Sequence, residues 1–126
     1  MNTGANLRLR WINRTAYNGG MIRRSHIKRY AVELARAIRP ERIILFGSYA
    51  YGKPTSDSDV DQLVVMPHTG HDIKEAVRIR QCLAAPFPLD LIVRTPEALR
   101  DRLDAGDAFL KSVMERGKVL YEASQS

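Results

Sequence analysis

The 126-residue chain lacks the disulfide bonds that stabilise many small secreted proteins and the long apolar run that spans a membrane. It contains one cysteine, Cys82, which excludes an internal disulfide. We interpret Cys82 as a small core residue near the end of an apolar-periodic helix. No apolar run approaches the ~20 residues of a membrane span, and the N-terminus has no secretory signal. These absences predict a cytoplasmic protein without membrane association.

Acidic residues are missing from the first 30 positions, which carry seven basic ones. These are Arg8, Arg10, Arg14, Arg23, Arg24, Lys28 and Arg29. The chain has 20 Lys and Arg against 14 Asp and Glu, so this segment accounts for the whole net charge of +6. Nucleic acid or an acidic partner would suit it, but we favour a solvated tail joined to the exposed face of a first helix. Residues 1–22 are expected to form a loosely attached leader, and residues 23–122 a single domain.

Beyond the leader, helical and strand patterns alternate. Apolar residues at helical spacing run from Ile27 to Ile38, and Pro40 ends that helix. Strands are expected over residues 42–46, 59–66, 87–93 and 119–121, and further helices over 73–83, from 96 and over 109–114. Thr95 precedes a proline and an acid, which is a helix start. The order predicts an α/β (α+β) fold, a small mixed β-sheet flanked by helices.

Two aspartates, Asp59 and Asp61, are two residues apart at the start of a predicted strand. A period of two puts both carboxylates on one face, ~6.6 Å apart along the chain. Carboxylate oxygens bind hard cations such as Mg²⁺, and two ions ~3.5–4 Å apart stabilise an in-line phosphoryl displacement. Taken alone, Ser56-Asp57-Ser58-Asp59 is more typical of turn chemistry, because these side chains bond to their own backbone.

Asp90 favours the metal site over turn chemistry, because it lies in an apolar strand where an unpaired carboxylate would be costly to bury. If its strand neighbours that of Asp59, Asp90 completes a cluster of three carboxylates. The alternative is a salt bridge, with Arg94 or a helix arginine as partner.

Gly47-Ser48 directly follows a buried strand, where a tight turn presents backbone N–H groups that suit a phosphate. Residues 47–53 also match all but the end of a P-loop pattern. Pro54 occupies the position of the required hydroxyl, and no long helix is expected to follow. A P-loop is therefore not favoured.

Together, Leu45-Phe46-Gly47-Ser48, ten further residues and Asp59-Val60-Asp61 resemble the signature of the DNA polymerase beta-like nucleotidyltransferase superfamily. A third acid on a later strand, here Asp90, also belongs to that pattern. The chain resembles the minimal nucleotidyltransferase (MNT) branch, antitoxins that are partnered with HEPN-domain toxins. The resemblance covers roughly residues 25–121.

The resemblance implies that Gly47 and Ser48 bind the phosphates of an NTP such as ATP. Asp59 and Asp61 would hold two Mg²⁺ ions, with Asp90 as a shared ligand that activates the acceptor hydroxyl. Members of this branch transfer AMP to a tyrosine of the toxin.

Two positions depart from the family pattern. Tyr51 stands where many relatives have a basic residue, and Gln62 where they have an apolar one. Lys53 or an N-terminal arginine is the expected substitute for the missing charge.

The alternatives are an antitoxin that acts by binding alone, and a nucleotidyltransferase that acts on RNA or a small molecule. A further alternative is a basic nucleic-acid-binding protein without enzymatic activity. The sequence leaves oligomerisation open.

Overall fold

A five-stranded mixed sheet forms the centre of the computed structural model, which describes residues 9–11 and 20–124. Its strands are β1 (Leu9–Trp11), β2 (Arg42–Phe46), β3 (Val60–Val65), β4 (Leu89–Arg94) and β5 (Lys118–Glu122). Their spatial order is β1-β4-β3-β2-β5. β3 and β4 are parallel, whereas the other neighbouring strands run antiparallel. The predicted mixed sheet flanked by helices is confirmed.

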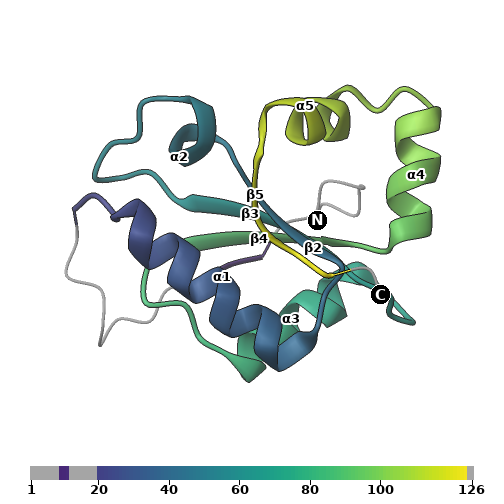
Figure 1. Ribbon diagram of the computed structural model, residues 1–126, viewed down its shortest axis with the longest axis horizontal. Coiled ribbons are helices and arrows are strands. Elements are labelled where there is room, and N and C mark those ends of the chain that lie inside the picture. The colour runs from purple at the N-terminus through teal and green to yellow at the C-terminus, as the bar shows by residue number, and fades with distance from the viewer. Residues whose placement is uncertain (1–8, 12–19, 125–126) are drawn as a thin grey trace.

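Helices cover both faces of the sheet (Figure 1). They are α1 (Arg24–Ile38), α2 (Ser48–Tyr51), α3 (Asp72–Cys82), α4 (Pro96–Asp104) and α5 (Ala108–Arg116). α1 and α3 lie on one face, and α4 and α5 lie on the other (Figure 1). The short helix α2 follows the end of β2, and its buried residues Tyr49 and Ala50 belong to the core on the α1 side. In the described part of the chain, no helix has the length and apolar character that crossing a membrane requires.

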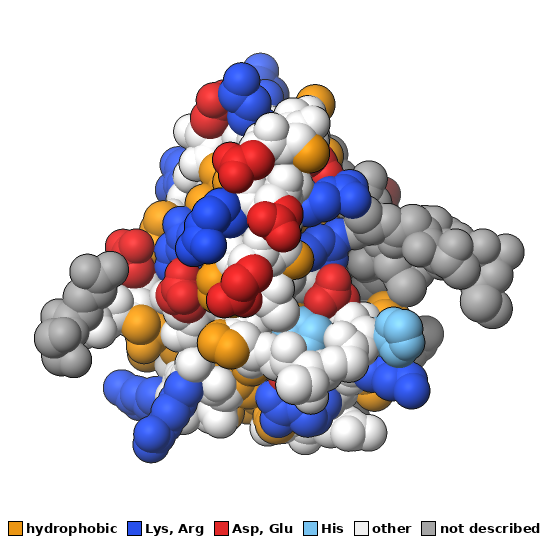
Figure 2. All heavy atoms as spheres, turned by 90° about the vertical axis from the view of Figure 1, so that its right-hand side faces the viewer, with side chains coloured by type: hydrophobic (Ala, Val, Ile, Leu, Met, Phe, Trp, Pro, Cys, Tyr) orange, Lys and Arg blue, Asp and Glu red, His pale blue; other side chains and the backbone are white. Residues whose placement is uncertain are grey.

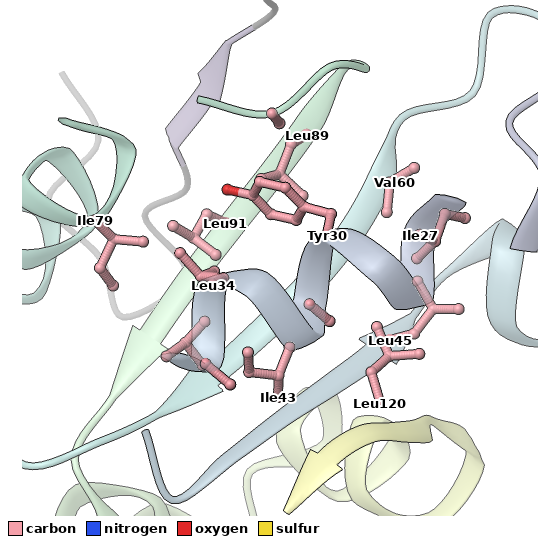
Figure 3. Close-up of a cluster of buried hydrophobic side chains, with 14 of the residues drawn as sticks. Ile27, Tyr30, Leu34, Ile43, Leu45, Val60, Ile79, Leu89, Leu91 and Leu120 are labelled. Carbon is pink, nitrogen blue, oxygen red and sulfur yellow. The ribbon is translucent and has the colours of Figure 1, made fainter. Parts of the chain in front are cut away.

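Side chains that alternate along the strands build a separate core on each face. Leu45, Val64 and Leu91 pack beneath α1 and α3. Figure 3 shows Leu45 and Leu91 with the apolar stripe of α1. Ile44, Leu63 and Ile92 face α4 and α5. Val60 belongs to the core on the α1 side. Because neighbouring residues in a strand point to opposite faces, Asp61 lies on the α4–α5 side.

Local signals place most helix boundaries. α1 ends at Ile38, two residues before Pro40, as predicted. Thr95 caps α4 by accepting a hydrogen bond from the Ala98 backbone N–H (3.1 Å). Asp107 caps α5 in the same way through the Leu110 N–H (3.0 Å). These caps fix where the helices on the α4–α5 face begin.

The prediction that Cys82 is a core residue is wrong, because its side chain is exposed. α3 ends at this residue, and the next one, Leu83, is extended and packs against the core instead. The strand boundaries also differ slightly, since β3 begins at Val60 rather than Asp59 and β4 at Leu89 rather than Phe87.

β1 lies within the residues that were expected to form a leader. It pairs with β4, and the register sets Arg10 opposite Asp90. Residues 1–8 and 12–19 of that leader lie outside the described part of the chain. The domain boundary near residue 22 therefore stays a prediction.

Candidate functional site

Two half-buried aspartates lie side by side on neighbouring strands. Asp61 in β3 and Asp90 in β4 are Cα partners in the parallel register. Adjacent strands run ~4.8 Å apart, so the two side chains emerge next to each other on the α4–α5 face. Like charges directly opposite in a sheet are destabilising. This juxtaposition therefore costs stability unless a cation offsets it.

Asp59 lies immediately before β3 at the same end of the sheet. The first residues of the two strands are tied together, because the Val60 N–H donates to the Pro88 carbonyl (3.0 Å). All three predicted acids thus lie at the amino ends of the parallel pair.

The Gly47 turn lies against Asp61. β2 ends at Phe46, which is the Cα partner of Asp61, and the chain then turns at Gly47 with φ +75°. A Cβ added to Gly47 would lie 3.1 Å from the Asp61 Cγ and closer still to Oδ2. Only glycine suits both the backbone conformation and the close approach. The structure therefore brings Gly47-Ser48 and Asp61 together at one edge.

Short helix α2 is held in place from the α1 side. The Ile22 backbone N–H donates to the Tyr49 hydroxyl (3.1 Å), and the Arg24 guanidinium donates to the Tyr49 carbonyl (3.3 Å). Tyr49 and Ala50 are buried. These contacts fix the path of the chain directly after the Gly47 turn.

The segment between α2 and β3 has the turn chemistry that its composition suggests. The Thr55 backbone N–H donates to the Ser58 hydroxyl (2.8 Å), and the Ser58 N–H donates to the Thr55 carbonyl (3.0 Å). Residues 53–59 contain no helix, so the long helix of a P-loop is missing here.

The donor set suits a hard divalent cation. Carboxylate oxygens are preferred ligands of Mg²⁺, and the register sets two carboxylates side by side. Within residues 9–11 and 20–124, no three His, Cys, Asp or Glu side chains are gathered closely enough to enclose an ion. The structure provides the Asp61–Asp90 pair, and participation of Asp59 in a metal site stays a prediction.

A cation that the sequence did not single out lies over Tyr51. The Arg116 guanidinium carbon, at the end of α5, is 4.1 Å from the centre of the Tyr51 ring. Such stacking is typical of a cation–π contact. The two residues are far apart in the chain, and no local pattern indicates their contact.

Arg94, the partner suggested for Asp90, interacts with a different acid. Its Nη1 lies 3.4 Å from the Asp72 carboxylate and donates to the Val93 carbonyl (2.8 Å). The His68 ring is 2.7 Å from the other Asp72 oxygen. Arg94 is buried, and this burial lowers the pKa of its guanidinium. The Arg94–Asp72–His68 cluster lies at the carboxyl ends of β3 and β4.

Gln62 is 0% exposed on the α1 face of β3, opposite the acids. Neither its amide nitrogen nor its amide oxygen has a hydrogen-bond partner among the described residues. It occupies a core position for which the resemblance led us to expect an apolar residue.

Comparison with known proteins assigns the family. A family model for the nucleotidyltransferase domain matches residues 26–120, which include every predicted site residue. The chain therefore belongs to the nucleotidyltransferase domain family.

Individual relatives agree with this assignment. A Methanocaldococcus jannaschii protein named putative protein adenylyltransferase is 34% identical over 83 residues, covering 66% of this chain and 80% of the relative. A solved toxin–antitoxin structure with AMP-PNP matches at TM-score 0.51 and 27% identity, covering 78% of this chain and 75% of that one. A putative nucleotidyltransferase structure from Sulfolobus solfataricus has the same fold (TM-score 0.53, 19% identity, 78% of each chain).

Proposed function

We propose that this protein is a Mg²⁺-dependent protein adenylyltransferase that transfers AMP from ATP to a hydroxyl of a partner protein. The observation that carries the proposal is the pairing of Asp61 with Asp90 beside the Gly47 turn. Two adjacent acids next to a turn that suits phosphate form a site for a nucleotide and its cations. The name of the 34% identical relative supports a protein acceptor.

In the proposed reaction, an acceptor hydroxyl oxygen attacks the α-phosphorus of ATP. A new P–O bond forms, the bond to the β-phosphate oxygen breaks, and pyrophosphate leaves. Gly47 and Ser48 bind the phosphates, and Asp90 takes the proton of the hydroxyl. Asp59 and Asp61 would hold Mg²⁺, which when bound neutralises charge on the phosphates.

The acceptor that we propose is a tyrosine of a HEPN-domain toxin, so that transfer makes this protein an antitoxin. The structural relative described as a toxin–antitoxin with AMP-PNP supports a toxin as partner. The HEPN class and the tyrosine rest on the sequence resemblance. A cytoplasmic location follows from the same proposal.

The test is to incubate the protein with α-labelled ATP, Mg²⁺ and the product of the neighbouring gene. We expect label on the partner, at a tyrosine located by peptide mass spectrometry. The Asp59→Asn/Asp61→Asn double variant should transfer nothing measurable, whereas Asp57→Asn should transfer normally. Asp57 is a matched control because it is an exposed acid in the adjoining turn.

Each alternative predicts a different outcome. Neutralisation of the toxin without label, unchanged in the double variant, would support an antitoxin that acts by binding. Label on RNA or a small molecule would move the acceptor to another class. Transfer by the double variant at the rate of the wild type would contradict the proposed site.

A further inference from the structure

α5 leads into β5, which flanks β2 on one side, whereas the strands that carry the acids, β3 and β4, lie on the other side of β2. β5 pairs antiparallel with β2, and the pairing nearest to the end of β2 is Leu45 with Lys118. The end of α5 at Arg116 is joined to β5 through Gly117 alone, so it lies beside the end of β2. Asp61 is the partner of Phe46 on the other side of β2. The end of β2 therefore has Asp61 on one flank and the start of β5, which follows α5, on the other.

Close packing at Gly117 keeps α5 in this position. A Cβ added there would lie 2.9 Å from the Leu45 carbonyl oxygen and 2.7 Å from Cγ2 of Ile44. Because no side chain separates the two backbones, the last residue of α5 lies directly beside the end of β2. The position of Arg116 is therefore set by the sheet itself.

The Tyr51 ring holds the Arg116 side chain near the turn. The guanidinium carbon is 4.1 Å from the ring centre, and the Tyr51 backbone N–H donates to the Gly47 carbonyl (3.1 Å). Tyr51 thus lies one helical turn from Gly47. A guanidinium stacked by one face on a ring keeps its N–H edge available for planar acceptors such as phosphate.

Charge balance indicates what this cation does. ATP brings about four negative charges to a site that already contains Asp59, Asp61 and Asp90. Arginine binds phosphate through charge-assisted, often bidentate hydrogen bonds. We propose that Arg116 is a phosphate-binding residue of the nucleotide site and that Tyr51 is its positioning residue. This inference rests on the proposed function, and it assigns the compensating charge to Arg116 rather than to Lys53 or an N-terminal arginine.

The experiment compares binding of ATP and of adenosine, each with Mg²⁺, to the full-length chain by calorimetry or competition. Arg116→Ala should weaken ATP binding by about tenfold or more, because it removes charged hydrogen bonds, and should leave adenosine binding unchanged. Lys111→Ala is the matched control, since Lys111 is an exposed cation on the same helix. It should bind both compounds as the wild type does.

Three further variants separate charge from position. Tyr51→Phe keeps the ring and should retain ATP affinity, whereas Tyr51→Leu should lose part of it. Circular dichroism confirms folding of each variant. Arg116→Lys should fall between the wild type and Arg116→Ala, because it keeps the charge without the planar fork.

Three outcomes would overturn the inference. Arg116→Ala could bind ATP as tightly as Lys111→Ala, or it could lose ATP and adenosine affinity equally, which indicates a structural role. A wild-type chain that binds no ATP would overturn the proposed function and this inference with it. In the first two cases the proposed function survives.

Discussion

The parallel strands β3 and β4 carry ionisable side chains at both ends, and the two ends arrange them differently. At the amino ends, Asp61 and Asp90 are adjacent acids. At the carboxyl ends, Arg94 is matched by Asp72, which also contacts His68. Figure 2 views the molecule from this second end, where acidic and basic side chains are interspersed. Under the proposed function, the ions at the carboxyl ends hold the fold, and the acids at the amino ends bind a ligand.

The two ends should respond oppositely to substitution. Loss of a member of the Arg94–Asp72–His68 cluster leaves a polar group without its partner, so stability falls. Loss of one acid of an adjacent pair relieves repulsion, so stability holds or rises. Activity should follow the reverse pattern under the proposed function.

The largest expected effect is that of Asp90→Asn on nucleotide transfer. If Asp90 is the base and a cation ligand, as proposed, its loss removes several kcal/mol of transition-state stabilisation, on the order of a thousandfold in rate. Urea denaturation should show a free energy of unfolding equal to or above that of the wild type. A variant that unfolds more easily and transfers normally would place Asp90 among the structural ions.

Arg94→Ala should have the opposite effect. It leaves a cavity at a position where the side chain is only 5% exposed, and it removes the partner of Asp72. We expect the free energy of unfolding to fall by about 1–3 kcal/mol, with transfer per folded molecule unchanged. Paired urea and activity measurements test this, and lost activity at unchanged stability would contradict the structural role.

Gln62→Leu should stabilise the protein, since Gln62 is a buried polar group in the middle of β3, away from the charged groups at both ends of the strand. Replacing an amide that has no described partner with an apolar side chain should raise the free energy of unfolding by about 1–2 kcal/mol. Gln62→Met, which is closer in shape, should change stability in the same direction. A fall in both variants would show that the amide is hydrogen-bonded.

The smallest expected effect concerns Asp107, near the carboxyl ends of β3 and β4. Its carboxylate caps α5 and lies 2.8 Å from Arg102. The Leu110 backbone N–H lowers the pKa of this carboxyl, and Arg102 lowers it further. Asp107→Ala should reduce the free energy of unfolding by about 1 kcal/mol at neutral pH.

The pH dependence of that difference gives a second check. Because the pKa is lower in the folded state, the stabilisation from the charge is complete well above the unfolded value of about 3.9. It is lost as pH falls through the folded pKa. Asp107→Asn keeps a good cap without the charge, so the gap between it and the wild type should close in acid. A gap that persists in acid would show that the charge is not its source.

Local patterns predicted the framework because they depend on neighbouring residues. The stripe from Ile27 to Ile38 and the break at Pro40 give the end of α1 correctly, and Thr95 caps α4 as expected. Hydrophobic runs located four strands but shifted three starts, since they do not show where pairing begins. Asp90 was expected to join the other two acids if its strand neighbours that of Asp59, and β3 and β4 are indeed neighbours.

Features that depend on distant residues escaped prediction. β1 has only three residues, and its pairing with β4 spans most of the chain. Cys82 follows the helical period, but α3 ends there, so the period no longer determines burial. The Tyr51–Arg116 contact joins two helices through the pairing of β2 with β5. In each case tertiary packing decides the outcome.

The β3–α3–β4 unit, from Val60 to Arg94, carries Asp61 and Asp90 on two strands joined by one crossover helix. Exchange of this unit between relatives would transfer both acids in register. Insertion of one residue inside β3 would instead turn Asp61 toward α1, because a shift of one residue reverses the face of each later side chain. Length changes in the turn before α3 would spare this geometry. Divergence of the family at this unit should therefore keep strand length and vary the connections.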